Sequence, residues 1–443
     1  MTDERTIPGA REDGREFDLV VFGATGLTGR LVVEQLAGVD RLLRSPAGGR
    51  RWAVAGRDRG RVAGVLAELS LDDVAIVVAD LDDRESLERL ARRATVVLNL
   101  AGPYMRTARD LIAACVENGA SYVDLSGELP LLRRVIDRFD AAARQAGVQV
   151  VQMAGWEAMP ADLATLVACE RAAGAGAGHD GPGAAAPIAD VTVAITFTRT
   201  PEGGVPFTQA VSAGTMASVI AMLDDPEAGL VGRPEALLPT VSVALGGPRP
   251  GPMRFGASEA SGRVLGPVVP VAFLNPPIVH RTAALLAQER GATYRPATYR
   301  EGVDNGRSVG AAGLRRKVRT AAKGSLQRLA VGLTRLPLAG RRAASGQIRK
   351  ILPEAGTGPS GSYLRDWEWE VEARATSRAG AFGIATIAGS GHPGYTATAA
   401  IIVEVALSMA DRGGRPRRSG CITPALAIGA AAEPLRVGSL SLR

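Results

Sequence analysis

Short apolar runs alternate with helix-length amphipathic segments over the first third of the chain. The apolar runs have the length of buried strands and lie at 17–22, 52–55, 74–79, 95–100, 122–125 and 148–153. Between them, apolar positions recur with helical periodicity at 27–36, 84–92, 108–118 and 131–146. Continuously apolar strands that alternate with helices are typical of a parallel sheet covered on both faces. Because crossovers in such sheets are right-handed, the pattern predicts a doubly wound α/β (Rossmann) domain over 17–155.

The pattern changes after residue 155. Residues 161–172 and 208–223 have helical periodicity, whereas 191–198, 365–375 and 382–388 are strand-like. Residues 174–187 form a low-complexity stretch, which predicts a surface loop. These elements predict a second, α+β substrate domain over 156–395 with an open sheet.

The two ends of the chain are expected to differ. Residues 1–16 are polar and mixed in charge, which predicts a disordered tail and not a signal peptide. Residues 396–410 predict an apolar helix, and we expect the carboxyl-terminal segment, 396–443, to be helical and to return to the first domain. The uncharged runs at 204–223 and 264–279 are interrupted by polar residues or proline, so no membrane span is predicted.

Residues 307–350, the basic segment, hold twelve basic and no acidic residues, although the whole chain has a formal net charge of only +7. Apolar residues 314, 318, 322, 329, 333 and 336 fall on one helical face, and basic residues 316, 319 and 323 lie opposite. Two interpretations stay open: a solvated helix face, or a docking surface for an acidic carrier protein or anionic lipid headgroups. Nucleic acid is not expected as a partner, because aromatic interleaving and nucleic-acid-binding motifs are lacking.

Cysteine, histidine and lysine usage excludes several mechanisms. The three cysteines and three histidines are scattered, so we expect a reducing, cytoplasmic location, no disulfide framework and no metal site. The only lysines are Lys317, Lys323 and Lys350. None follows a Walker A glycine loop, and none stands four residues after a tyrosine, so P-loop and short-chain dehydrogenase chemistry are excluded.

Three regularly spaced glycines follow the first predicted strand. Gly23, Gly26 and Gly29 stand where this strand gives way to a helix, which is the context of a dinucleotide-binding loop. The first glycine permits the tight turn, the second lets the backbone approach a pyrophosphate, and the third lets helix and strand touch. The free N–H groups and dipole of the helix start attract the phosphates. The predicted contact loop consists of Gly23, Thr25, Gly26, Leu27, Thr28 and Gly29.

The tip of the second strand indicates which dinucleotide is bound. NAD sites place a carboxylate there for the ribose 2′-hydroxyl, whereas this chain has Arg57, which can clamp a 2′-phosphate. Hydrogen bonds to charged groups contribute about 1.5–3 kcal/mol, which favours NADP roughly 10- to 100-fold. Asp58 is expected to cap the next helix. Asp80, after the third strand, is assigned to the adenine side of the site, with helix capping as the alternative.

The fourth strand ends in Asn99-Leu-Ala-Gly102-Pro103-Tyr104. Ligands of a doubly wound sheet lie beyond the carboxyl ends of its strands. We therefore expect Asn99, Gly102 and Pro103 beside the nicotinamide, and Tyr104 to point towards the substrate.

Together these stretches resemble the saccharopine dehydrogenase-like oxidoreductases and, within them, the trans-acting enoyl reductase group. The resemblance covers almost the whole chain, at 20–30, 55–57, 99–104, 122–128, 155–162, 212–215, 358–360, 393–395 and 423–425. It implies NADPH as hydride donor and an acyl thioester substrate in polyketide-derived lipid assembly at a membrane. Two departures concern the substrate side. Trp156, Glu157, Ala158 and Ala161 replace the family's usual Phe, Asp, Ser and Ser, and His392 replaces Asp.

The implied reaction adds a hydride to the β-carbon of an unsaturated thioester and a proton to the α-carbon. A positioned acid is worth about 10²–10⁴-fold in such a step. Tyr104 is the first candidate, because it follows the nicotinamide loop, and packing at the domain interface is its alternative role. Glu157 and His392 are the next candidates. Asp124 and Glu128 either shape the site or cap a helix, and Asp162 is expected to cap the helix after Pro160.

Other functions and partners stay open. An imine or ketone reductase similar to saccharopine reductase needs a carboxylate clamp, for which Arg199, Arg263, Arg295 and Arg300 are available. A non-catalytic NADP-binding scaffold on carrier or lipid surfaces is the alternative of another class. Peripheral contact with the inner face of the plasma membrane and a homodimer are further options.

Overall fold

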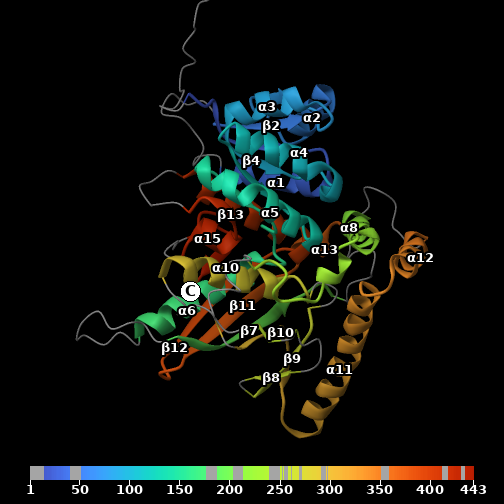
Figure 1. Ribbon diagram of the computed structural model, residues 1–443, viewed down its shortest axis with the longest axis vertical. Coiled ribbons are helices and arrows are strands. Elements are labelled where there is room, and N and C mark those ends of the chain that lie inside the picture. Colours follow the sequence, from blue (N-terminus) through green and yellow to red (C-terminus); the bar gives the residue numbers. More distant parts are fainter. Residues whose placement is uncertain are drawn as a thin grey trace, which may run out of the picture.

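The computed structural model describes residues 14–39, 51–175, 187–202, 213–238, 250–251, 253, 258–260, 262–268, 272–290, 296, 298–350, 359–411, 418–430 and 435–443. The described elements form two seven-stranded sheets. In Figure 1 the first sheet and its helices occupy the upper part of the molecule, and the second sheet lies below. The predicted surface loop at 174–187 falls almost entirely outside the described residues.

The first sheet is parallel throughout, in the order β13-β6-β5-β4-β1-β2-β3. Its strands are β1 (Phe17–Phe22), β2 (Trp52–Gly56), β3 (Ala75–Val78), β4 (Ala94–Asn99), β5 (Ser121–Asp124), β6 (Gln149–Val151) and β13 (Gly420–Ile422). Every residue of β1 and β4 is buried, as continuously apolar runs predict for strands covered on both faces. The predicted doubly wound Rossmann sheet is confirmed.

Five helices connect these strands: α1 (Leu27–Gly38), α2 (Arg59–Glu68), α3 (Arg84–Arg93), α4 (Tyr104–Glu117) and α5 (Leu129–Gln145). Asp58 caps α2, as predicted, because its carboxylate accepts the Arg61 N–H. Asp83 caps α3 in the same way. These caps fix where each helix begins and therefore which loop residues remain beyond the strand ends.

The second sheet is mixed, in the order β14-β12-β11-β7-β10-β9-β8. Its strands are β7 (Ile188–Arg199), β8 (Ser258–Ala260), β9 (Arg263–Gly266), β10 (Thr298–Arg307), β11 (Glu368–Ser377), β12 (Phe382–Ser390) and β14 (Leu440–Leu442). Only the β7–β10 pair is parallel among the pairs described. The predicted α+β domain with an open sheet is confirmed.

One face of this sheet is covered by α6 (Met159–Ala175), which contacts β7, β11 and β12. The contact is close at Gly383, where a Cβ atom would lie 2.6 Å from the Ala172 backbone nitrogen. The remaining described helices are α8 (Ala213–Asp224), η2 (Ala228–Leu230), α10 (Asn275–Arg290), α11 (Gly310–Leu333), α12 (Leu338–Arg349), α13 (Ser362–Arg365), η4 (Pro393–Ala397), α14 (Thr398–Ala410) and α15 (Pro424–Ile428).

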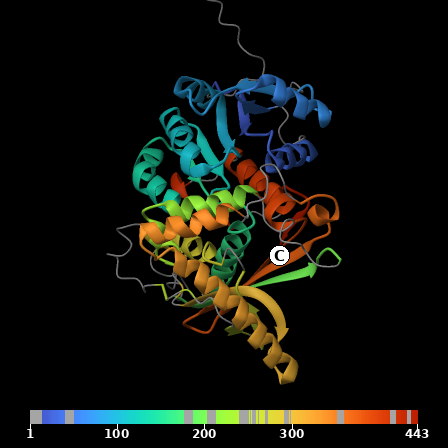
Figure 2. The ribbon, with the colours of Figure 1, turned by 90° about the vertical axis from the view of Figure 1, so that its right-hand side faces the viewer.

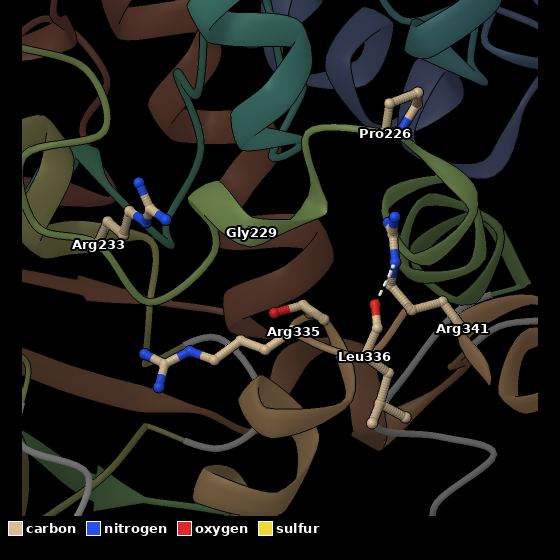
Figure 3. A pocket seen from close by; sticks show the side chains of 7 residues that line it. Pro226, Gly229, Arg233, Arg335, Leu336 and Arg341 are labelled. Atoms are coloured by element: carbon tan, nitrogen blue, oxygen red, sulfur yellow. Dashed lines mark hydrogen bonds between the residues drawn. The ribbon is translucent and has the colours of Figure 1, made fainter. Parts of the chain in front are cut away.

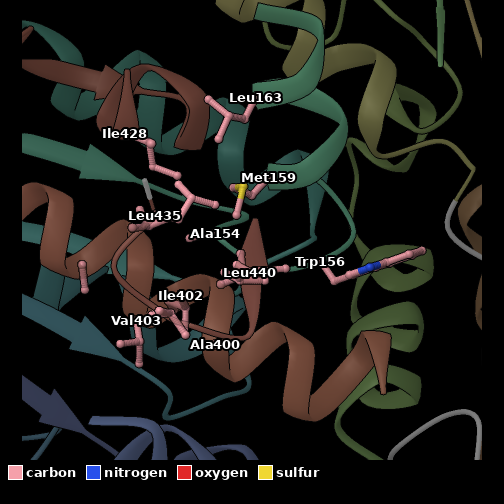
Figure 4. Close-up of a cluster of buried hydrophobic side chains, with 14 of the residues drawn as sticks. Ala154, Trp156, Met159, Leu163, Ala400, Ile402, Val403, Ile428, Leu435 and Leu440 are labelled. Carbon is pink, nitrogen blue, oxygen red and sulfur yellow. The ribbon is translucent and has the colours of Figure 1, made fainter. Parts of the chain in front are cut away.

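The predicted carboxyl-terminal helix, α14, does return to the first sheet. Each of its residues is buried, and it contacts α1, β1, β4 and β5. Figure 4 shows its side chains, among them Ile402, gathered with residues of α6, α15 and the chain end. The stretch Pro393–Ala410 is apolar and long enough to span a bilayer, but 83% of it is buried inside the fold, as in a core helix.

The carboxyl-terminal segment is not only helical, which corrects the expectation from its sequence. It also supplies β13 to the first sheet and β14 to the second. Both strands have three residues, and such short runs carry little periodicity of their own. Glu404 in α14 anchors this segment, because its carboxylate accepts hydrogen bonds from the backbone N–H groups of Arg436 and Val437.

The basic segment forms α11 and α12, and α11 presents its apolar stripe to solvent. Leu314, Val318 and Leu329 are 63–64% exposed. The buried face of α11 is made of small or polar residues, Gly313, Thr320, Gly324 and Gln327, and of Val331. Figure 2 shows α11 projecting from the body of the molecule.

Candidate active site

The predicted dinucleotide loop adopts the geometry that its glycines require. Gly23 has φ +96°, and a Cβ atom there would lie 2.8 Å from the Ala101 nitrogen. A Cβ atom on Gly29 would lie 2.7 Å from the Ala24 Cα atom, so only glycine lets α1 touch the turn after β1. At Gly26, by contrast, the nearest atom is the Gly23 carbonyl oxygen at 3.9 Å. The loop is closed on two sides and open at the middle glycine.

This open position fits a diphosphate. Gly26 is the N-cap of α1 and provides no side-chain cap, and the first turn holds no acidic residue. The N–H groups at Leu27, Thr28 and Gly29 precede the first helical hydrogen bond, which Arg30 donates to Gly26. Thr25 is exposed beside them. The loop therefore offers backbone donors and the positive end of a helix dipole to an anion.

Arg57 lies beyond the end of β2, where the ribose of a dinucleotide is expected. Its side chain is exposed and forms no ion pair with any residue that the structure describes. Asp80 lies beyond β3 on the outer side of Arg57, and its carboxylate accepts the Asp82 N–H. The sheet order thus places Arg57 one strand from the glycine loop and Asp80 one strand farther out.

Asn99 organises the turn after β4. It is fully buried, its Nδ2 donates to the Tyr122 hydroxyl at 2.9 Å, and its Oδ1 accepts the Ala101 N–H at 3.0 Å. Gly102 and Pro103 are joined by a cis peptide and lead directly into α4. Tyr104 starts this helix, and its hydroxyl donates to the Asn99 carbonyl oxygen at 3.3 Å. The turn therefore folds back over the end of β4.

Three carboxyl groups surround the Tyr104 hydroxyl closely enough to affect its ionisation: Asp124, Glu128 and Glu157. Asp124 ends β5, Glu128 follows it, and Glu157 follows β6, which lies on the other side of β5 from β4. Because parallel strands end at one edge, residues from three loops meet here. We call Tyr104, Asp124, Glu128 and Glu157 the acid cluster.

Hydrogen bonds fix the acid cluster. Asp124 accepts the Tyr122 hydroxyl at 2.8 Å and the Ser126 hydroxyl at 2.6 Å. Glu128 accepts the Gly127 N–H at 3.0 Å and the Ser218 hydroxyl of α8 at 2.7 Å. The α8 helix of the second domain thus completes a site that begins on the first sheet.

Burial favours the protonated forms of these groups. Loss of solvation raises the pKa of Asp124 to about 6 and that of Glu157 to about 7, and it also raises the pKa of Glu128. For Tyr104 burial is again the largest cause, followed by repulsion from Asp124, and its pKa lies well above the usual value. The cluster can therefore hold transferable protons at neutral pH.

His392 lies in the turn that follows β12. It is buried, its ring contacts Trp367 and Tyr395 with centroids 5.0 Å away, and its Nδ1 accepts the Gly394 N–H. It directly precedes η4, which contacts α1. The sequence predicts Tyr104, Glu157 and His392 as one catalytic set. Glu157 lies close enough to Tyr104 to affect its ionisation, and the catalytic role of His392 stays a prediction.

A row of aromatic side chains runs from the residue before Glu157 to His392. Trp156 stacks on Phe197 with ring centroids 5.8 Å apart, and Phe197 packs edge-to-face on Trp367 with centroids 5.7 Å apart. The Trp367 ring in turn contacts His392. Phe197 and Trp367 are only half-buried, so one side of the row is accessible. In Figure 4, Trp156 points away from the other labelled side chains. The row forms an apolar wall that starts at the residue before Glu157.

Asp162 departs from its prediction, and Ser218 was not predicted. Asp162 does not cap α6. It is buried in the first turn of that helix, where it accepts the Thr282 hydroxyl and the Ala425 N–H. Ser218 was not singled out, since a serine inside an apolar helix gives no signal until its partner Glu128 is known.

Comparison with known proteins supports the assignment of the first domain. The family profile described as the saccharopine dehydrogenase NADP-binding domain matches residues 19–151. This region contains the glycine loop, Arg57 and the acid cluster up to Glu128. Residues 19–151 are therefore an NADP-binding domain.

Relatives match over nearly the full chain. The trans-acting enoyl reductases of Mycobacterium ulcerans and Mycobacterium leprae are both 33% identical, over 426 and 438 residues, which is 94% and 95% of each chain. A Mycobacterium tuberculosis protein that carries this name provisionally is 32% identical over 443 residues, 97% of each chain. A solved structure of apo saccharopine dehydrogenase from Saccharomyces cerevisiae aligns over 96% of this chain and 98% of its own, with 11% identity and a TM-score of 0.48.

Proposed function

The chain belongs to the trans-acting enoyl reductase family and is an NADP-dependent oxidoreductase, and from this premise we propose that it saturates the C=C bond of a polyketide or fatty acyl thioester. The observation that carries the proposal is the acid cluster. Tyr104 and Glu157 hold protons at the edge of the sheet where the glycine loop also lies. Saturation of an unsaturated thioester needs both a hydride and a proton at such a place.

NADPH, when bound, supplies the hydride for the β-carbon. The residues of this chain supply the proton. The Tyr104 O–H bond breaks and a C–H bond forms at the α-carbon, so the double bond gains one hydride and one proton. Glu157, whose pKa is about 7, is the second candidate donor, and either residue regains its proton from water. The other cluster members hold Tyr104 in a poorly solvated position in which its neutral form persists.

The aromatic row supports an acyl substrate. Trp156, Phe197 and Trp367 offer flat apolar surface next to Glu157, and two of the rings are partly accessible. An acyl chain on this surface gains about 25 cal/mol for each Å² removed from water.

An amino-acid substrate, as an imine or ketone reductase would take, is less well supported. Of the arginines available for a carboxylate clamp, Arg300 pairs with Asp190 at 2.7 Å, Arg263 pairs with Asp304, and Arg199 lies 3.8 Å from Glu368. Arg295 lies outside the described residues. The guanidinium groups that the structure describes in this set already have carboxylate partners.

The test is incubation with NADPH and an enoyl thioester, with product analysis by mass. We expect the thioester to gain the mass of two hydrogen atoms while NADPH is consumed, and Gly29→Ala to reduce both strongly. Tight NADPH binding without turnover of any enoyl thioester would instead favour the scaffold interpretation. Reduction of imines or ketones alone would favour the second enzyme class.

The exposed stripe of α11 supports a peripheral location at the inner face of the plasma membrane. Leu314, Val318 and Leu329 project from a helix that also carries Arg319 and Lys323, a pattern suited to anionic lipid surfaces. Co-sedimentation with vesicles containing phosphatidylglycerol should fall in Leu314→Ser/Leu329→Ser and persist in Phe382→Ser, which removes an exposed apolar residue elsewhere. Concentration-dependent dimerisation that the double variant abolishes would assign the stripe to a homodimer instead.

A further inference from the structure

A second polar site lies away from the acid cluster. It is a pocket of about 360 Å³ where the turn around η2 meets the junction of α11 and α12 (Figure 3). Its lining residues are Pro226, Gly229, Arg233, Thr334, Arg335, Leu336 and Arg341. Three of these seven carry a positive charge, and none is an acid. The pocket has no role in the hydride or proton transfer described above.

The charge on Arg341 has no acidic counterpart in the described structure. Arg341 is only 6% exposed, and its guanidinium donates to the backbone carbonyl oxygens of Leu336, Leu223 and Asp225. Carbonyl oxygens satisfy N–H groups but do not neutralise a charge. A buried guanidinium without an anion is costly, so an anionic ligand at this place stabilises the fold.

Arg233 and Arg335 add two accessible charges. Both are exposed, and neither forms an ion pair with the residues that the structure describes. Figure 3 shows them on one side of Gly229, with Arg341 on the other. Three guanidinium groups that line one pocket suit an anion with several acceptor oxygens, and phosphate esters present such a set.

The acids nearest in sequence are already occupied. Asp225 and Glu227 flank the lining residue Pro226, but both bind Arg134 of α5, at 2.8 and 2.7 Å. Asp224 binds Arg349 at 2.8 Å. The carboxylates that could have neutralised the pocket arginines are thus paired with other arginines.

One helix links this pocket to the acid cluster. Ser218 of α8 donates to Glu128, and α8 ends at Asp224, two residues before Pro226. At a rise of 1.5 Å per residue, the six residues from Ser218 to Asp224 span roughly 9 Å along the helix axis. A ligand with a reactive group at one end and a phosphate at the other can therefore engage both.

We propose that the arginine pocket binds the phosphate ester of the pantetheine arm that carries the acyl thioester. The proposal rests on the proposed substrate class, since a carrier arm holds its thioester at one end and its phosphate at the other. Arg233 and Arg335 contact the phosphate, and Arg341 adds a buried positive charge to the pocket lining. The same chemistry is present in coenzyme A and on a carrier protein, and both are ligands of this pocket.

The first experiment compares substrates with and without the phosphate. In Arg233→Gln/Arg335→Gln, we expect kcat/KM for an enoyl coenzyme A thioester and for a carrier-bound one to fall roughly 10- to 100-fold, in line with hydrogen bonds to charged groups. The same enoyl group on N-acetylcysteamine, which has no phosphate, should react as with the wild type. Arg89→Gln/Arg92→Gln is the matched control, because it removes two exposed charges of α3, outside both the pocket and the basic segment. An equal loss for the phosphate-free thioester, or for the control pair, would overturn the proposal.

A binding measurement tests the phosphate site even if the protein reduces no thioester. Calorimetry with saturating NADP compares 4′-phosphopantetheine with pantetheine, so that the nucleotide site is filled. We expect the phosphate to improve affinity roughly tenfold or more in the wild type and not in the double variant. Equal affinity for the two ligands would refute the assignment. Loss of binding to phosphatidylglycerol vesicles in the double variant, with phosphopantetheine binding unchanged, would assign the pocket to a lipid headgroup.

Discussion

The two seven-stranded sheets differ in how they place polar groups. In the first, every strand runs in the same direction, and the loops after β1, β2, β4, β5 and β6 all open on one edge. The glycine loop, Arg57 and the acid cluster therefore converge there, although up to 134 residues separate them in sequence. In the second sheet the strands are mostly antiparallel, and no single edge collects their ends. Its candidate ligand groups lie on α11 and, at the arginine pocket, on α12 and on the turns that hold Arg233 and Arg335.

This difference indicates a division of labour. A parallel sheet brings backbone donors and acids to one point, which suits a cofactor and bond-making groups. Helices attached to a mixed sheet can offer charge and apolar surface at a distance, which suits holding a long substrate. Substitutions at the first edge should weaken cofactor binding or slow the chemistry, and those in the second region should change substrate handling only.

The largest effect is expected from Gly29→Ala. The added methyl group would overlap the backbone of Gly23 and Ala24, which cannot move without opening the turn. Overpacking costs about 1–3 kcal/mol, and at its upper end NADPH affinity falls about 100-fold. Fluorescence titration with NADPH measures this. Gly38→Ala, in the same helix but with open space at its Cβ, serves as the control and should bind normally.

Arg57→Ala should weaken NADPH binding roughly 10- to 100-fold and leave NADH binding unchanged, because only NADPH has the 2′-phosphate. Parallel titrations with the two cofactors measure the preference. Arg61→Ala removes an exposed arginine of α2 and should leave both affinities intact. Equal weakening for NADH would contradict a contact with the 2′-phosphate.

Tyr104→Phe should lower turnover at least tenfold, at the low end of the contribution of a proton donor, with NADPH affinity kept. Steady-state kinetics with an enoyl thioester measure it. Tyr363→Phe alters a half-buried tyrosine on α13 and should have no effect. Full turnover in Tyr104→Phe would remove this residue from the mechanism.

The pH profile separates the two candidate donors. With Tyr104 as donor, kcat should stay flat as pH rises through 7, because its pKa lies far above that value. With Glu157 as donor, kcat should fall above pH 7 as the carboxyl ionises, and Glu157→Gln should be inactive at every pH. A decline centred near pH 7 in the wild type would therefore move the role from Tyr104 to Glu157.

The smallest effect concerns Asp162, between α6, α10 and α15. Its pKa is raised to about 7 in the fold from 3.8 in the unfolded chain, so the folded state binds more protons between these values. Its contribution to stability is thus lost as pH rises from about 4 to 7. The drop in melting temperature from pH 5 to pH 8 should be smaller in Asp162→Asn than in the wild type, and an unchanged drop would contradict the assignment.

Local patterns predicted most of the first domain. Each strand from β1 to β6 was expected within a few residues of its place, since buried parallel strands are continuous apolar runs. The glycine loop carries its signal within seven residues. Tyr104 was expected at the site from the rule that ligands lie beyond strand ends, whereas Glu157 and His392 were singled out only by the family resemblance.

The sequence alone determined the Rossmann half, the cofactor class and the residues that line its loop, because these depend on hydrophobic period and on glycine spacing over short distances. Only the tertiary structure decided that Ser218 meets Glu128, that β13 and β14 complete both sheets, and that the stripe of α11 faces solvent. The arginine pocket also belongs here, since its charges come from segments about 100 residues apart. Such features depend on which surfaces pack together, and packing between distant segments does not produce a hydrophobic periodicity in the sequence.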